Sequence, residues 1–237
     1  MLKIFHPETI KAQSSIQLQG KEAHHLFHVL RGRDGERVIV LNGQGYYGEG
    51  HILDRRMGTV AIDELHYREK PKIYLYPALL KSKAMDFLIR EATAIGVAEI
   101  IPFVTQHSAV KMNVEMAKEK KLHWDNIAKE ACKQSGNPWL PAIEIPKKFA
   151  QISLPRPTLI ASLRGERTQI FSRETIIRNS SINLVIGPEG DFSEEEYECF
   201  IGENTYFIQL GKNVLRSEIA ALYLLSVVDH IMGENEP

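Results

Sequence analysis

Short apolar runs separated by turn-forming residues fill the first 70 or so positions of the chain. The runs have the β-branched and aromatic content of strands, and they are SIQL, RVIVL, YYGEGHI and GTVAI. This pattern predicts a small β-barrel or sandwich. One segment, KEAHHLFHVL, departs from it, because Ala23, Leu26, Phe27 and Leu30 are spaced to share one face of a helix. The charged, proline-containing segment YREKPK then indicates a linker.

From Ile73 onward, apolar runs alternate with segments of helical periodicity. The expected strands are IYLYPALL, EIIPFV, TLIASL, INLVIG and TYFIQL. The expected helices lie near 83–95, 114–134, 168–178 and 193–201, and a final helix reaches about Met232. Such alternation is typical of an α/β domain with a mostly parallel sheet covered on both faces. Ligands of these sheets bind beyond the carboxyl ends of the strands.

Length and charge set limits without indicating a function. The chain has 237 residues, enough for two domains. Its formal net charge is -1, so overall charge gives no argument for a nucleic-acid partner. No stretch approaches the roughly 20 apolar residues of a membrane span. The start, MLKIFHPETI, lacks the apolar core of a signal peptide, so we expect a cytosolic protein.

The cysteines and the clustered histidines do not have the spacing of a metal or redox site. Cys132 and Cys199 lie far apart in unlike contexts, so we expect two buried thiols. His25 and His28 are three positions apart, but no carboxylate or thiolate stands at ligand spacing. We therefore expect these histidines to pack against neighbouring side chains or to contact phosphate groups, and we expect no metal.

The segment Gly43-Gln-Gly45-Tyr-Tyr-Gly48 formally matches a dinucleotide-binding fingerprint after a strand. Its context does not fit, because Tyr46, Tyr47 and the following residues favour a second strand over a helix. We expect a glycine-rich hairpin here. The chain also lacks the phosphate-binding motif GxxxxGK[ST] of P-loop nucleotidases.

The segment LVIGPEGDFSEEE carries more information. A β-run ends in Gly187-Pro188-Glu189-Gly190, and Ser193 followed by Glu196 forms a capping-box pattern that predicts a helix start. The glycines would let backbone groups approach a ligand closely.

A second strand end with a glycine turn follows in YFIQLGKNVLRSEIAALYLLSVV. The strand ends in Leu210-Gly211, a short link carries Lys212, Asn213 and Arg216, and an apolar helix begins around Ser217 or Glu218. Two such strand ends indicate a small-molecule site. The helix has an apolar face that either packs inside the protein or forms a subunit contact, and it consists of Ala220, Ala221, Leu224, Leu225 and Val228.

The two motifs together, IGPEGDFSEEE and LGKNVLRSEIAAL, resemble the signature pair of the SPOUT methyltransferases of RsmE type. Similar segments run along nearly the whole chain, and they include KIFHPE, HHLFHVLRGRDGERVIVLNGQG, KSKAMDFLIREATAIGVAEIIPF and WDNIAKEACKQSGNPWLPAI. The resemblance implies an RNA-binding, PUA-like β-barrel at 1–70. It also implies a SPOUT-type α/β methyltransferase domain at 72–237 whose C-terminal part forms a trefoil knot.

The resemblance further implies a homodimer that binds S-adenosylmethionine and methylates N3 of a uridine in small-subunit (16S) ribosomal RNA. The cofactor would lie in three loops, whose matching residues are Leu163, Arg164, Gly187, Pro188, Glu189, Gly190, Leu210, Gly211, Asn213, Val214, Leu215 and Arg216. The chain departs from the family pattern, mostly at presumed RNA-facing positions, at Glu91, Ala94, Gln106, His107, Asn137, Asn213 and Ile219.

The chemistry of this reaction suggests roles for particular residues. Uridine N3 must lose its proton, and a cation would stabilise the charge left on the ring. Arg216 is the candidate cation. Glu218 could act as a base, orient Arg216 or cap the helix.

RNA contacts are expected from basic residues of both domains, with Arg31 and Arg33 as first choice and Lys81 and Lys83 second. Two other interpretations stay open. One is a methyltransferase of this architecture with another RNA target, and the other is an RNA-binding or ribosome-assembly protein without turnover.

Overall fold

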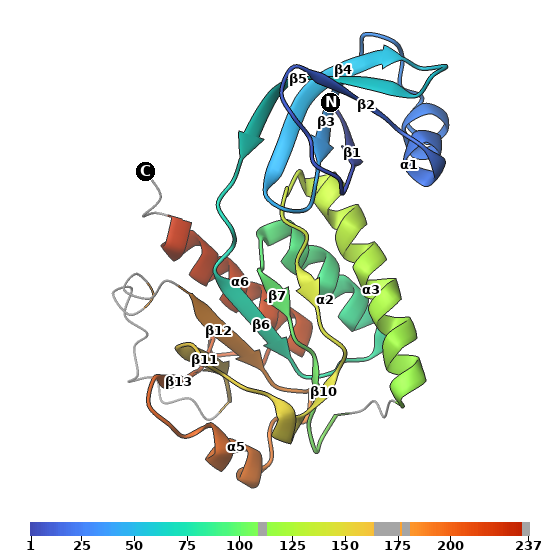
Figure 1. The fold of residues 1–237 in the computed structure, drawn as a ribbon. Coiled ribbons are helices and arrows are strands. Elements are labelled where there is room, and N and C mark those ends of the chain that lie inside the picture. Colours follow the sequence, from blue (N-terminus) through green and yellow to red (C-terminus); the bar gives the residue numbers. More distant parts are fainter. Residues whose placement is uncertain (109–112, 164–175, 177–180, 234–237) are drawn as a thin grey trace. The chain divides into compact units, whose positions relative to one another are not determined.

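The computed structural model describes residues 1–108, 113–163, 176 and 181–233 (Figure 1). Two compact units make up the chain. The first consists of Met1–Lys70 with Ala128–Leu140, and the second of Pro71–Ile127 with Pro141–Pro237. Helix α3 (Val114–Ser135) therefore contributes residues to both units.

A five-stranded sheet forms most of the first unit. Its elements are β1 (Leu2–Phe5), β2 (Ser14–Gln17), α1 (Gly20–His24), η1 (His25–Val29), β3 (Arg37–Leu41), β4 (Tyr46–Asp54) and β5 (Thr59–Tyr67). The strand order is β1-β3-β4-β5-β2, and all pairs are antiparallel except β1 with β3. Buried residues alternate along β3 and β4, and their side chains form one core with Leu26 and Phe27. The pattern of the sequence thus predicted β2, β3, β4 and β5 correctly, whereas β1 was not among the strands expected from it.

The expected helix over KEAHHLFHVL is present but changes its winding. The α-helical turn α1 continues as η1, a π-helix in which the Leu30 amide donates to the His25 carbonyl at 2.9 Å. This wider turn rotates later residues away from the expected face. Leu26 and Phe27 are buried, whereas Leu30 is exposed.

The glycine-rich segment between β3 and β4 is a hairpin, as the sequence predicted. Gly43 and Gly45 have φ angles of 78° and 93°, in the left-handed region that favours glycine. The Asn42 side chain accepts hydrogen bonds from the amides of Gln44 and Tyr46.

A six-stranded, fully parallel sheet forms the centre of the second unit, which confirms the expected α/β class. Its order is β13-β11-β12-β6-β7-β9. The elements of this unit, apart from α3, are β6 (Ile73–Pro77), α2 (Ser82–Ile95), β7 (Glu99–Ile100), β8 (Phe103–Val104), β9 (Ala142–Ile143), β10 (Lys147–Lys148), η2 (Phe149–Gln151), β11 (Thr158–Ala161), β12 (Ile182–Ile186), α5 (Glu194–Phe200), β13 (Thr205–Ile208) and α6 (Ser217–Gly233).

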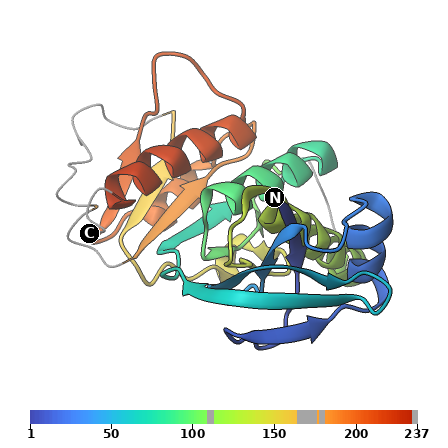
Figure 2. The ribbon, with the colours of Figure 1, turned by 90° about the horizontal axis from the view of Figure 1, so that it is seen from above.

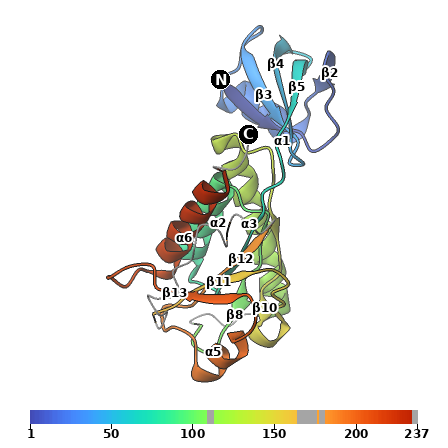
Figure 3. The same ribbon diagram turned by 90° about the vertical axis from the view of Figure 1, so that its left-hand side faces the viewer.

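Helix α6 runs across β6, β11 and β12 and packs beside α2 (Figures 2 and 3). Its five residues expected on an apolar face are all buried within the chain, and they are Ala220, Ala221, Leu224, Leu225 and Val228. Packing inside the protein therefore accounts for this face.

Elsewhere in the unit, Tyr197 and Phe200 of α5 share a hydrophobic cluster with Ile160 of β11 and Val185 of β12.

The expectation of two buried thiols is half wrong. Cys132 is buried in the first unit, and burial raises its pKa to about 12. Cys199 is exposed, because α5 turns Tyr197 and Phe200 inward and presents the intervening positions to solvent.

The expected helix near 168–178 lies outside the described residues, except for Ile176. None of the described helices is both long and apolar enough to cross a membrane.

Candidate functional site

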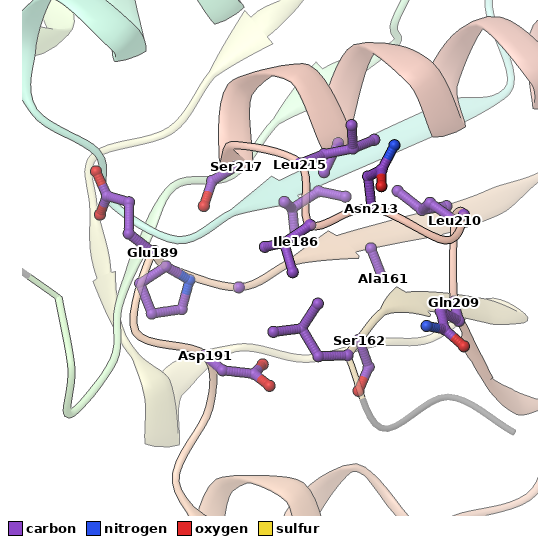
Figure 4. A pocket seen from close by; sticks show the side chains of 16 residues that line it. Ala161, Ser162, Ile186, Glu189, Asp191, Gln209, Leu210, Asn213, Leu215 and Ser217 are labelled. Atoms are coloured by element: carbon purple, nitrogen blue, oxygen red, sulfur yellow. The ribbon is translucent and has the colours of Figure 1, made fainter.

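A pocket lies at the carboxyl ends of β11, β12 and β13, three neighbouring parallel strands of the second unit (Figure 4). Three loops and the start of α6 line it, with the residues Ala161, Ser162, Leu163, Ile186, Gly187, Pro188, Glu189, Asp191, Gln209, Leu210, Gly211, Asn213, Val214, Leu215, Ser217 and Ala220. Parallel strands bring their carboxyl ends to one edge of a sheet, so distant sequence segments meet there.

Most residues expected to hold a cofactor line this pocket. They are Leu163, Gly187, Pro188, Glu189, Leu210, Gly211, Asn213, Val214 and Leu215. Gly190 and Arg216 directly adjoin lining residues in the chain but do not line the pocket themselves. Arg164 lies outside the described residues.

The loop after β12 is held in place by the start of α5. As the sequence predicted, Ser193 and Glu196 form a capping box, in which the Ser193 amide donates to Glu196 Oε2 at 3.0 Å. The Glu196 amide donates back to Ser193 Oγ at 3.3 Å. In the same turn, a backbone hydrogen bond and the Ser193 side chain lower the pKa of Glu195. The helix start therefore fixes the end of the glycine loop.

Gly187 has little room for a side chain. A Cβ atom there would lie 3.1 Å from the Phe192 ring. Gly190 is similarly close to another part of the unit, since its Cβ would lie 3.3 Å from Cβ of His107. A side chain at either glycine of the GPEG segment would therefore crowd a neighbouring side chain.

The segment after β8 supports this loop from outside. The Gln106 amide donates to Glu196 Oε1 at 2.8 Å, and His107 Nδ1 lies 3.1 Å from the Asp191 carbonyl oxygen. Gln106 therefore contacts the first turn of α5, and His107 contacts the loop after β12 that lines the pocket.

The sequence did not identify several polar residues of the pocket, and they are Ser162, Asp191, Gln209 and Ser217. Ser162 Oγ lies 2.6 Å from the Tyr197 hydroxyl, which donates to Asp191 Oδ1 at 2.8 Å. Asp191 and Gln209 directly adjoin the expected loops, so slightly wider loop boundaries would have included them. The role of Tyr197 in joining two strand ends has no signal in the sequence.

Arg216 and Glu218 form an ion pair at the start of α6. Arg216 Nη1 lies 3.4 Å from Glu218 Oε1, and the two side chains are 78% and 10% exposed. Glu218 can therefore orient Arg216, one of the roles expected for it. The guanidinium faces solvent, where it can meet a second molecule.

The expected RNA contacts all lie on the surface. Arg31 and Arg33 are exposed on the first unit, and Arg31 has a φ angle of 58°. Lys81 and Lys83 are exposed at the start of α2 in the second unit, after the carboxyl end of β6.

The charges of the pocket favour one kind of ligand. Among its described lining residues, Glu189 and Asp191 are the ionisable ones, and none is basic. Apolar side chains lie beside the neutral hydrogen-bonding groups of Ser162, Gln209, Asn213 and Ser217. This combination suits an aromatic ligand with positive charge better than one with phosphates. Within the described ranges, no group of three metal-ligating side chains is close enough to hold a metal ion.

Known proteins are similar to this chain over most of its length. Residues 68–229 match the RNA methyltransferase domain family, and residues 18–56 match the RNA methyltransferase PUA domain family. The chain is 27% identical to the ribosomal RNA small subunit methyltransferase E of Bacillus subtilis (strain 168), over 94% of this chain and 93% of that protein. It is 31% identical to the protein of the same name in Mesomycoplasma hyopneumoniae (strain 232), over 66% of this chain and 69% of that protein.

A solved structure has the same fold over nearly the full length. The Legionella pneumophila protein Lpg2936, in complex with the bound cofactor SAM, is 25% identical with a TM-score of 0.82, over 97% of each chain.

Proposed function

Because the chain belongs to the RNA methyltransferase family, we propose that it transfers a methyl group from S-adenosylmethionine to N3 of a uridine in small-subunit (16S) ribosomal RNA. The observation that carries this proposal is the pocket at three parallel strand ends, with glycine loops and acidic side chains. Related proteins named for this ribosomal RNA activity, and one solved with SAM, support it. Such a substrate would place the reaction in the cytoplasm.

The residues of the pocket fit S-adenosylmethionine. Ile186, Leu210 and Leu215 provide apolar contact for an adenine ring, while Ser162 and Asn213 offer hydrogen bonds. When bound, the cofactor supplies a methyl group on a positively charged sulfur. The chain itself must hold that methyl group in line with the uridine nitrogen, and positioning of this kind supplies much of the rate.

Arg216, held by Glu218, would stabilise the charge that develops on the uridine ring. Transfer of the N3 proton to Glu218 or to water leaves negative charge on the uridine ring, and an exposed guanidinium beside the pocket would stabilise it. The 3.4 Å ion pair with Glu218 would hold the guanidinium in position for this role. The cation therefore acts on charge that develops during the reaction.

Positive charge on both units would bind the RNA. Arg31 and Arg33 of the PUA-like region at 1–70, with Lys81 and Lys83 of the methyltransferase domain at 72–237, would contact phosphates. The target base must lie in a loop or flip out of its stack to reach the pocket.

We further propose a homodimer and a C-terminal trefoil knot. Support for the dimer comes from a second apolar stripe on α6 at four-residue spacing, in which Ile219 is partly exposed and Tyr223 and Val227 are exposed. These side chains lie on the side of α6 away from its buried residues. The knot rests on the resemblance of the signature motifs.

A methylation assay tests the function directly. Pure protein would be incubated with labelled S-adenosylmethionine and small ribosomal subunits from a strain that lacks the modification, and the labelled nucleotide would then be mapped. We expect label on N3 of one uridine in 16S RNA. Label in another RNA would overturn the substrate, and cofactor binding without any transfer would favour a non-catalytic role in ribosome assembly.

A further inference from the structure

Asp191 is the less exposed of the two acidic residues in the pocket. It is partly buried, whereas Glu189 is exposed at the neighbouring turn. Figure 4 shows its carboxylate directed toward the part of the pocket that Ser162 lines. From these observations and those below, we infer that Asp191 binds a cationic group of the methionine end of S-adenosylmethionine.

The backbone at Asp191 has a conformation that is unfavourable for most residues. Its φ angle is 60°, in the left-handed region where glycine is the usual residue and a side chain is sterically unfavourable. The Asp191 amide donates to the Pro188 carbonyl at 3.0 Å and closes the turn. Because of this turn, the carboxylate points into the pocket rather than into solvent.

Two hydrogen bonds fix the carboxylate through one of its oxygens. Oδ1 accepts the Tyr197 hydroxyl at 2.8 Å and the Phe192 amide at 2.9 Å. Tyr197 is itself buried and lies 2.6 Å from Ser162 Oγ, so it acts as a positioning residue. The second oxygen, Oδ2, has no hydrogen-bond partner among the described residues, which leaves it available to a ligand.

The charge of the ligand then follows from what surrounds this oxygen. None of the described lining residues is basic, so the described part of the pocket supplies no counter-charge to this carboxylate. A carboxylate in such a place favours a bound cation. The methionine end of S-adenosylmethionine carries two cations, the sulfonium and the α-ammonium, and the adenosine end carries none at neutral pH.

This inference rests on the proposed function, and a binding series separates the two. Calorimetry would measure the affinities of S-adenosylmethionine, S-adenosylhomocysteine and methylthioadenosine for the full chain and for Asp191→Asn. The first ligand has both cations, the second has only the ammonium, and the third has neither. Asparagine keeps the shape of the side chain and tolerates the left-handed backbone, so folding should be preserved.

We expect Asp191→Asn to lose about tenfold in affinity for S-adenosylmethionine and less than about twofold for methylthioadenosine. An equal loss for S-adenosylhomocysteine would assign the contact to the ammonium, and a smaller loss would assign it to the sulfonium. Either result supports the inference. An equal loss for methylthioadenosine, or no loss for any ligand, overturns it.

Two further variants serve as controls. Asp191→Gly removes the carboxylate and relieves the backbone, so it should show the same ligand pattern as Asp191→Asn. Glu198→Gln removes an exposed acidic group of α5 outside the pocket and should leave all three affinities unchanged. If the unchanged protein binds none of the three ligands, the proposed function fails before the role of Asp191 is tested.

Discussion

At the scale of single residues, the role proposed for Arg216 is distinct from that of the pocket. Its guanidinium is largely exposed and pairs with Glu218, and it does not line the cofactor pocket. We expect Arg216→Ala to raise the activation free energy of methyl transfer by about 2.7–4 kcal/mol while cofactor affinity changes little. Single-turnover rates at saturating RNA, measured beside cofactor binding, check this. Lys212→Ala, in the same link but also outside the pocket, is the matched control, and an unchanged single-turnover rate in Arg216→Ala would refute the assignment.

The two cysteines should react very differently. Burial raises the pKa of Cys132 to about 12, so almost none of it is thiolate at pH 8, whereas Cys199 is exposed. We expect iodoacetamide at pH 8 to modify Cys199 in the native protein and both cysteines after unfolding in urea. Peptide mass mapping reads the result directly. Equal modification of both residues in the folded protein would contradict the burial of Cys132.

At the scale of elements, the capping box of α5 supports the pocket as well as the helix. Ser193→Ala would remove the side-chain acceptor for the Glu196 amide, and we expect a loss of about 0.5–2 kcal/mol in the free energy of unfolding. We also expect weaker cofactor binding, because the loop before Ser193 lines the pocket. Urea unfolding and calorimetry measure the two effects. Ser15→Ala, on an exposed position of β2, should change neither.

Most of the elements could be predicted from the sequence because their signals are local. Alternating apolar and polar residues identified most strands of the first unit, continuous apolar runs identified the central strands of the second, and the S-x-x-E pattern identified the start of α5. The π-helical turn at η1 could not be predicted from the sequence. Its backbone hydrogen bonds differ from those of an α-helix, but the spacing of its apolar residues is the spacing expected of an α-helix. The sequence predicted the pocket residues that belong to the two motifs. It could not predict the hydrogen bond between Ser162 and Tyr197, because these residues are 35 positions apart.

At the scale of the whole molecule, RNA binding and oligomeric state are separate questions. If Arg31 and Arg33 contact phosphates, replacing both with alanine should lower the slope of log affinity against log salt by roughly 0.7–0.9 per lost contact. Binding isotherms at several salt concentrations give that slope. Arg37→Ala is the comparison, because the Arg37 guanidinium already pairs with Glu49 at 3.0 Å. An unchanged slope in the double variant would show that residues other than Arg31 and Arg33 contact the phosphates.

The apolar stripe of α6 formed by Ile219, Tyr223 and Val227 predicts the effect of a charge at its centre. Tyr223 is 51% exposed, between Ile219 and Val227. We expect Tyr223→Glu to convert a dimer into a monomer, because two carboxylates would be buried in a symmetric interface. Sedimentation at low concentration distinguishes the two forms. Tyr46→Phe, on the first unit, should remain dimeric. If the unchanged protein is a monomer, the proposed homodimer is wrong.

The division of α3 between the two units has a consequence for synthesis. Residues 128–140 complete the first unit, where Cys132 packs with Phe5 and Leu41, and the Trp139 indole donates to the Arg68 carbonyl at 2.8 Å. A ribosome releases the chain from its N-terminus, so residues 1–70 emerge before the residues that cover this part of their core. The nascent first unit must wait, incompletely packed, while much of the second unit is translated.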